Sequence, residues 1–354
     1  RCADSLSLRD FLGVGATGRT PDHSSLTVIR QRLPLAVYQE VLAFVLKLAA
    51  KEGFFEGKIA GMDATLLEAN AAMKSIVRRD TGDDWKAYVR HLAAEEGVEI
   101  DDDEDLRRFD KTRKNKGVSN KDWKSETDPD SRIMRMKNGR THLAYKAEHA
   151  MDLDSQLVLA AEIFAGDVSD GDSMAETARK AKALVRRING RNTLRDIVAD
   201  KGYHKTAALV DMKKLGLRTY VPERNDPSQR VLVGKPSAEK EAVYGNRRRV
   251  RGKRNAGLQR SRTEITERGF AHACVTGGGR RSHLRGLEQV RKRHLCLVAA
   301  LNLGVIMRKA FGIGTPKALQ GLASLLRALL RALCVAWRSS QAPPQSSDPI
   351  PAAA

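Results

Sequence analysis

The spacing of apolar residues predicts a helical module over residues 1–56. In PDHSSLTVIRQRL, a helix start signal at Asp22 precedes apolar residues at helical spacing. A longer helix is expected to follow, and its apolar stripe is expected to be formed by Val37, Val41, Leu42, Val45 and Leu48. The beginning of the chain is therefore expected to fold as a small helical unit.

Residues 57–312 alternate between strand and helix patterns. KIAGMDATLL predicts a strand, and RTHLAYKAEHAMD followed by QLVLAAEIF predicts a β-hairpin over 140–165. A helix over 172–189, a strand in LRDIVAD, a helix over 204–215 and a strand in RTYVPER follow, and then helices at about 262–275 and 285–311. This order predicts an α/β domain with a mixed sheet flanked by helices, although order alone does not single out one fold.

Two segments depart from this pattern. An insertion at about residues 75–138 has poor hydrophobic periodicity and contains an acidic run followed by a basic run, so we expect it to be solvated, partly helical and partly disordered. Over residues 313–354 we expect an amphipathic helix and a disordered tail. The apolar stretch Ala318 to Trp337 carries Arg327 and Arg331 on one helical face, which favours this helix over a transmembrane span.

The net charge of +20 is large for a globular chain and indicates a polyanionic partner, most often a nucleic acid. The segment Asn246 to Arg262, NRRRVRGKRNAGLQRSR, is rich in Lys and Arg and has no acidic residue, so it is expected to contact phosphates; a basic linker is the alternative. Arg30 and Arg32 leave two roles open for the N-terminal module: contact with DNA, or a cap on the main domain.

The four cysteines form no C-x-x-C pair, which disfavours both a zinc site and a disulfide framework and fits a reducing cytoplasm. No signal peptide is apparent. The chain begins at Arg1 rather than Met, as expected of a fragment that lacks its true N-terminus.

Three carboxylates are candidates for phosphodiester chemistry. Asp63 lies inside the apolar strand IAGMDATLL, Asp200 closes the apolar stretch DIVAD, and Glu267 lies in the helical segment TEITERGFAHA. Converging carboxylates can hold the pair of Mg²⁺ ions that such chemistry uses. Asp196 and Glu264 are competing candidates on spacing alone, since a strand-end Asp is often a turn former and a helical Glu is often solvated.

Several sequence blocks, in order, resemble bacterial insertion-sequence transposases of the DDE class, with the resemblance running from about residue 5 to residue 320. SLRDFLGV and PDHSSLTVIRQRL are similar to their N-terminal helical domain, GMDATLLEAN to their first-Asp block, and TDPDSRIMRMKNGRTHLAYKAEHAMD to the segment that leads into the hairpin. IVADKGYHK resembles the second-Asp block, and the stretch from ERGFAHACVTGGG to MRKAFG resembles the block that carries the catalytic Glu.

The resemblance implies a ribonuclease H-like fold and a divalent metal site formed by Asp63, Asp200 and Glu267. It implies two Mg²⁺ ions, for which Mn²⁺ substitutes, and action by a homodimer on terminal inverted repeats and target DNA. Many relatives have a lysine on the final helix where this chain has Cys274. The residues expected to contact DNA are Arg247, Arg248, Arg249, Arg251, Lys253, Arg254, Arg262, Arg280 and Arg281.

Other polar and aromatic residues have less specific interpretations. His142 and His149 are expected to make structural or DNA-backbone contacts, and Asn302 is expected to be a satisfied buried amide. Trp85 and Trp123 are expected to anchor a small cluster, with stacking on an extruded base as the alternative.

Two other functions remain open at this point. One is a ribonuclease H-like nuclease that hydrolyses DNA without strand transfer. The other is a catalytically decayed or repurposed DNA-binding protein, against which the presence of all three carboxylates argues.

Overall fold

The computed structural model describes residues 3–114, 119–190, 193–224 and 232–312. The chain divides into two units, residues 1–302 and 303–354. The amphipathic helix expected at 318–337 and the tail lie outside the described residues. In the second unit, the described part is the end of helix α10 (Leu287–Phe311) and Gly312.

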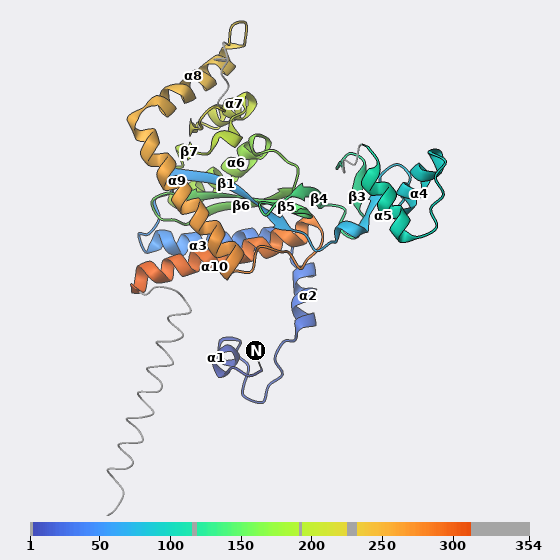
Figure 1. The fold of residues 1–354 in the computed structure, drawn as a ribbon. Helices are drawn as coiled ribbons and strands as arrows, with labels where there is room; N and C mark the ends of the chain where they lie inside the picture. Colours follow the sequence, from blue (N-terminus) through green and yellow to red (C-terminus); the bar gives the residue numbers. More distant parts are fainter. Residues whose placement is uncertain (1–2, 115–118, 191–192, 225–231, 313–354) are drawn as a thin grey trace, which may run out of the picture. The chain divides into compact units, whose positions relative to one another are not determined.

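A mixed sheet organises the first unit (Figure 1). Its strands are β4 (Arg132–Arg135), β5 (Thr141–Asp152), β1 (Ile59–Glu68), β7 (Asp196–Val198), β8 (Arg218–Tyr220) and β6 (Val158–Ala165). β1 is antiparallel to β5 on one side and parallel to β7 on the other, and β7 is parallel to β8. β4 and β6 share the outer edge of β5. The expected α/β class and mixed sheet are confirmed.

Helices cover both faces of β5. These are α6 (Asp170–Asn189) on one face and α9 (Lys253–Ala271) with the first part of α10 on the other. Glu148 hydrogen-bonds Ser173 of α6, whereas His149 stacks on Phe270 of α9 and hydrogen-bonds His294 of α10. Ten consecutive residues of β5, from Leu143 to Asp152, are consequently buried. The alternation read in RTHLAYKAEHAMD therefore separates two buried faces rather than a core face from a solvent face.

The N-terminal module contains α1 (Leu6–Phe11), α2 (His23–Arg32) and α3 (Leu35–Lys51). The side chain of Asp22 accepts hydrogen bonds from the backbone N–H groups of Ser24 and Ser25, so the expected helix start is confirmed. The prediction of which residues form the buried apolar stripe of α3 is partly wrong. Leu42 and Val45 are buried, but Val37 and Val41 are exposed, because the face that packs on the core is centred about one residue further round the helix.

The insertion is more ordered than its composition suggests. It contains β2 (Ile76–Arg78), α4 (Trp85–Glu95), α5 (Asp103–Thr112) and β3 (Trp123–Ser125), and β2 pairs with β3. Trp123 is buried and meets Tyr88 edge-on at 5.3 Å between ring centroids. The expectation that Trp123 anchors a small cluster is confirmed. Hydrophobic periodicity does not reveal this fold, because a few large side chains, rather than a regular apolar stripe, form its small core.

The basic run is not a linker. Residues Asn246–Arg262 form the end of α8 (Ser237–Arg251) and the first half of α9, which starts at Lys253 rather than near 262. α7 (Thr206–Lys214) packs against α8. The charges are therefore displayed on helices.

Among the described residues, α10 is the helix long and apolar enough to cross a membrane, and a bent pair, Ser24–Arg32 with Leu35–Lys51, also passes that test. Polar side chains of α10 are nevertheless buried in the first unit: Lys292, His294 and Asn302. This is the composition of a core helix in a globular protein, and it gives no clear indication of a membrane protein.

Two buried asparagines satisfy backbone groups at the two sides of the sheet. Asn302 accepts from the N–H of Val158 at 2.8 Å and donates to its carbonyl at 2.9 Å, at the start of β6. Asn246 of α8 makes the same pair of bonds with Val221, directly after β8. The expectation that Asn302 is a satisfied buried amide is confirmed.

We predict that Asn302→Leu and Asn246→Leu each lower the free energy of unfolding by about 2 kcal/mol, because each leaves a buried N–H and carbonyl unpaired. Urea denaturation measures the loss, with the exposed Gln39→Leu as the control. Wild-type stability in either variant would contradict this role for that asparagine.

Candidate active site

Asp63 lies in the middle of β1 and points toward α9. Its Oδ1 accepts from the backbone N–H of Ala64 at 2.8 Å, and its Oδ2 accepts from the hydroxyl of Thr266 at 3.1 Å. Arg262 Nη1 lies 3.5 Å from Oδ2. Burial raises the pKa of Asp63, and the contacts with Ala64, Arg262 and Thr266 oppose that shift. The side chain remains 26% exposed, so solvent or a ligand can reach it.

Asp200 follows the end of β7. It begins the short 3₁₀ helix Lys201–Tyr203, and its Oδ1 accepts from the N–H of Gly202 at 2.8 Å. A Cβ at Gly202 would lie 2.9 Å from this oxygen and 3.0 Å from Asp170 Oδ2. A residue with a side chain at this position would therefore crowd both carboxylates.

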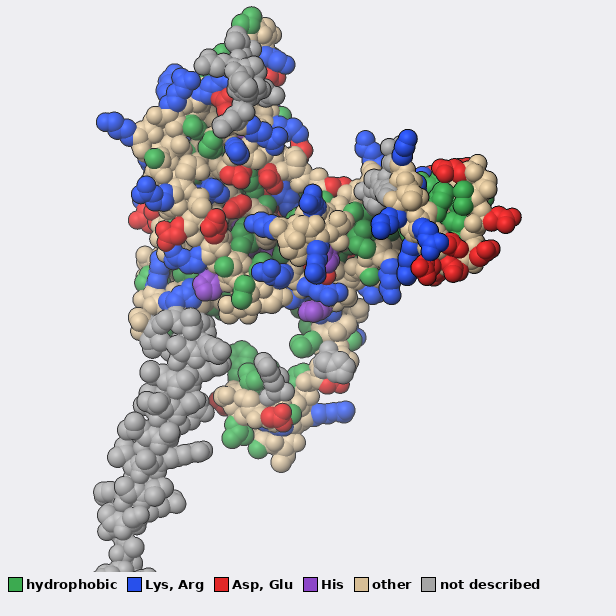
Figure 2. All heavy atoms as spheres, viewed as in Figure 1, with side chains coloured by type: hydrophobic (Ala, Val, Ile, Leu, Met, Phe, Trp, Pro, Cys, Tyr) green, Lys and Arg blue, Asp and Glu red, His purple; other side chains and the backbone are tan. Residues whose placement is uncertain are grey.

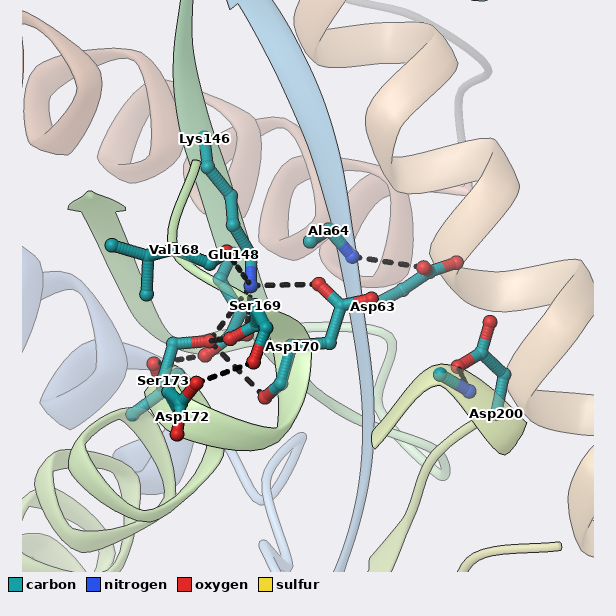
Figure 3. Close-up of polar contacts among 12 residues, drawn as sticks. Asp63, Ala64, Lys146, Glu148, Val168, Ser169, Asp170, Asp172, Ser173 and Asp200 are labelled. Carbon is teal, nitrogen blue, oxygen red and sulfur yellow. Dashed lines mark hydrogen bonds and ion pairs between the residues drawn. The ribbon is translucent and has the colours of Figure 1, made fainter. Parts of the chain in front are cut away.

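The parallel pairing of β1 with β7 brings Asp63 and Asp200 together. Gly61 is paired with Val198, and each aspartate lies two residues further along the chain, Asp63 within β1 and Asp200 beyond the end of β7. The negative charge of Asp200 contributes to the raised pKa of Asp63, which is consistent with their proximity. In Figure 3 both carboxylates lie on the same side of β1. The strand register thus places residues 137 positions apart in the sequence near each other.

Glu267 lies on α9, the helix that packs over β1, but its side chain is exposed. Its neighbour Thr266 is buried and contacts Asp63. Since successive helical residues are about 100° apart, Glu267 lies at the flank of the face that meets the sheet. The competing candidates are explained otherwise: Glu264 pairs with Arg268, and the buried Asp196 pairs with Arg218 at 2.6 Å.

Within the described ranges, no three His, Cys, Asp or Glu side chains are grouped closely enough to hold a metal ion. Asp63 and Asp200 nevertheless lie on neighbouring parallel segments and offer carboxylate oxygens, the donors that Mg²⁺ prefers. Asp63 is already in contact with a cation, the guanidinium of Arg262. These two residues fit one hard cation, whereas Glu267 makes no contact that completes the set.

The face of β5 that packs against α6 contains a buried charged network, which the sequence analysis does not predict. The Lys146 ammonium lies 2.6 Å from Asp170 and 3.5 Å from Glu148, and Glu148 accepts from Ser173 at 2.6 Å and from Thr177 (Figure 3). Burial raises the pKa of Glu148, which the nearby Lys146 opposes. The sequence signal was KAE inside a strand, because charges in a buried strand require partners.

The comparison with protein families settles the class of the chain. The family described as Transposase DDE domain matches residues 108–303, more than half of the chain. The chain belongs to the transposase DDE domain family. The resemblance to DDE-type insertion-sequence transposases is thereby confirmed. Neither the search of curated proteins nor the search of solved structures found a match.

The family match covers Asp200 and Glu267 of this transposase-family chain but begins after Asp63. The choice of Asp63 as a candidate therefore rests on the pairing of β1 with β7 and not on the matched region. The structure also explains Cys274, which packs against the hydrophobic cluster containing Phe270 and is half-buried. A cysteine carries no positive charge, so position 274 does not supply a basic contact to DNA.

The basic residues that were expected to contact DNA fall into two groups. Arg247 pairs with Glu223, Arg249 donates to the Thr219 carbonyl at 2.8 Å, Arg254 lies 3.4 Å from Asp196, and Arg262 is buried at Asp63. The side chains of the second group are exposed, as is that of Arg254 in the first group; the second group consists of Arg248, Arg251, Lys253, Arg280 and Arg281. Arg281 also lies 3.7 Å from Glu68, at the end of β1.

A buried histidine pair lies beside the site. His149, the register partner of Asp63, hydrogen-bonds His294 through the two Nε2 atoms at 2.7 Å. Burial lowers the pKa of His294 to about 4, with the charge of Arg293 adding to the shift, and burial also lowers the pKa of His149 well below its usual value. Both rings are therefore neutral in the folded protein near pH 7.

We predict that stability falls as the pH drops from about 6.5 toward 4, because the unfolded histidines bind protons in this window while the folded pair does not. For His294 the loss is on the order of 3 kcal/mol. Thermal unfolding between pH 7 and 4.5 tests this, and His294→Gln should show a shallower pH dependence. Equal slopes in both proteins would contradict the assignment.

Proposed function

We propose that this chain is a DNA transposase that cuts and joins strands at the terminal inverted repeats of an insertion sequence. The observation that carries this proposal is the meeting of Asp63 and Asp200 beneath α9 in a chain of the transposase DDE domain family. Asp63 within β1 and Asp200 just beyond the parallel strand β7 are both held by the backbone, as a metal-dependent centre requires. The substrate is DNA, and the protein acts in the cytoplasm.

The proposed cofactor is Mg²⁺, as two ions, with Mn²⁺ as a substitute. When bound, the metal supplies neutralisation of the charge that develops on the attacking and leaving oxygens during phosphodiester transfer. Asp63 and Asp200 would hold it, and Glu267 is proposed as the third ligand. The exposed position of Glu267 on the helix beside Asp63 leaves this carboxylate available to a ligand.

The proposed fold is ribonuclease H-like. Support comes from the central β1, which has antiparallel strands on one side and two parallel strands on the other, with the two aspartates on β1 and directly after β7. A homodimer on DNA is proposed from the family alone.

The proposed DNA surface lies on the exposed basic residues of α8 and α9. Figure 2 shows many Lys and Arg side chains over the elements that surround the sheet. Arg248, Arg251 and Lys253 are exposed around the junction of the two helices. Arg247 and Arg249 are instead bound to Glu223 and Thr219. Their role in this proposal is to orient α8, and the exposed residues make the phosphate contacts.

Asp63→Asn and Asp200→Asn should each reduce DNA strand cleavage by orders of magnitude, because each removes a charged metal ligand while keeping the side-chain shape. DNA binding should persist, since phosphate contacts elsewhere supply most of the affinity. A nicking assay with Mg²⁺ on the element's ends, alongside a gel shift, measures both. Glu264→Gln, which changes an exposed carboxylate on the same helix as Glu267, is the control, and wild-type cleavage by Asp63→Asn would refute the catalytic assignment. A wild-type protein that binds the ends but never nicks them would instead indicate a repurposed DNA-binding protein.

The triple variant Arg248→Ala, Arg251→Ala, Lys253→Ala should weaken binding to all DNA sequences and reduce the salt dependence of the affinity, because fewer counterions are released. Binding measured over a series of salt concentrations gives the slope. The matched control removes three exposed charges from the insertion, at Arg90 of α4 and at Arg107 and Arg108 of α5. An unchanged slope in the first variant would show that DNA binds elsewhere.

A further inference from the structure

Arg262 is a buried cation in contact with a proposed metal ligand. The residue is 9% exposed, and its Nη1 lies 3.5 Å from Asp63 Oδ2. Its other donors remain on its own helix: Nε donates to Gln259 Oε1 at 3.3 Å, and Nη2 donates to Thr263 Oγ1 at 3.1 Å. Because arginine stays protonated in proteins, this positive charge is permanent.

Gly61 allows Arg262 to reach Asp63. A Cβ at Gly61 would lie 2.7 Å from Leu153 Cδ2, 3.0 Å from Arg262 Cγ and 3.4 Å from Arg262 Cβ, so the stem of the arginine lies directly against β1. Gly61 and Asp63 are two residues apart and therefore face the same side of the strand. The glycine thus places the guanidinium beside the carboxylate.

Gln259 connects this arrangement to the other aspartate. Its Nε2 donates to the Tyr220 carbonyl at 2.9 Å and to the Ala199 carbonyl at 3.3 Å, directly before Asp200. Its Oε1 accepts from Arg262. One short network on α9 therefore contacts β1 at Asp63 and the chain beside Asp200.

The contact between Arg262 and Asp63 is long for a charge-assisted hydrogen bond, for which about 2.8 Å is typical. Two adjacent carboxylates repel each other unless a cation lies near them. A divalent ion supplies that compensation with twice the charge of a guanidinium. The two cations would repel each other at the same oxygen.

We propose that Arg262 is a positioning residue: it is the resident counter-cation of Asp63 in the metal-free protein, and a divalent ion competes with it for that carboxylate. This inference rests on the proposed function, since it takes Asp63 as a metal ligand. Arg262 holds Asp63 oriented and neutralised before metal binds, and it withdraws when metal binds.

The test is the affinity of the DNA-free protein for Mn²⁺, measured by calorimetry. Arg262→Met keeps the unbranched stem over Gly61 but removes the charge, and it should bind Mn²⁺ about three- to fivefold more tightly than wild type. Gly61→Ala keeps every charge but displaces the arginine stem, and it should change the affinity in the same direction. Arg260→Ala, which removes an exposed charge from the same helix, is the matched control and should stay near wild type.

A second readout is thermal unfolding. Arg262→Met should have a lower Tm than wild type without metal and should gain more than wild type when Mn²⁺ is added. A purely structural arginine would lower the Tm equally with and without Mn²⁺. If neither Arg262→Met nor Gly61→Ala binds Mn²⁺ more tightly than Arg260→Ala, the inference is overturned while the proposed function stands. If Asp63→Asn binds Mn²⁺ as wild type does, the metal site itself is wrong.

Discussion

Helix α9 packs on β1 at Gly61, where the absence of a side chain lets the stem of Arg262 lie against the strand. The rest of the candidate site depends on this contact. It brings Thr266 and Arg262 to Asp63, sets Gln259 against the ends of β7 and β8, and carries Glu267 to the flank of the same face. A Cβ at position 61 would lie 2.7 Å from Leu153 Cδ2 and 3.0 Å from Arg262 Cγ, so a larger residue would press on the arginine stem and disturb its contact with Asp63.

α6 on one face and α9 with α10 on the other make β5 a strand that is buried on both faces, with polar groups on each. Toward α6, Lys146 and Glu148 compensate each other's charge and are completed by Asp170, Ser173 and Thr177. Toward α9 and α10, the histidine pair stays neutral instead. Burying a charged group is costly unless the charge is paired or the group is neutral. The face toward α6 pairs its charges, and the face toward α9 and α10 carries neutral groups.

Much of the architecture follows from local patterns. Asp22 caps α2, the hairpin lies where its turn and strand residues predicted it, and the α/β order is that of the mixed sheet. The errors have identifiable causes. The stripe of α3 was assigned to Val37 and Val41 because periodicity does not say which of two apolar faces finds a partner. The insertion and the basic run were read by composition, yet α4 and α5 pack around a few large side chains, and α8 and α9 are helices that carry charge on their exposed faces.

By itself, the sequence determined the class of the protein. Blocks around Asp63, Asp200 and Glu267 indicated a DDE transposase, and the excess of positive charge indicated a polyanionic partner, since both depend on residue identity and order. Only the tertiary structure decided which of these side chains meet. Parallel pairing of β1 with β7 brings Asp63 beside Asp200, and the approach of α9 at Gly61 places Arg262, not Glu267, against Asp63. Such contacts depend on sheet register and helix rotation, which are set by packing between segments distant in the chain.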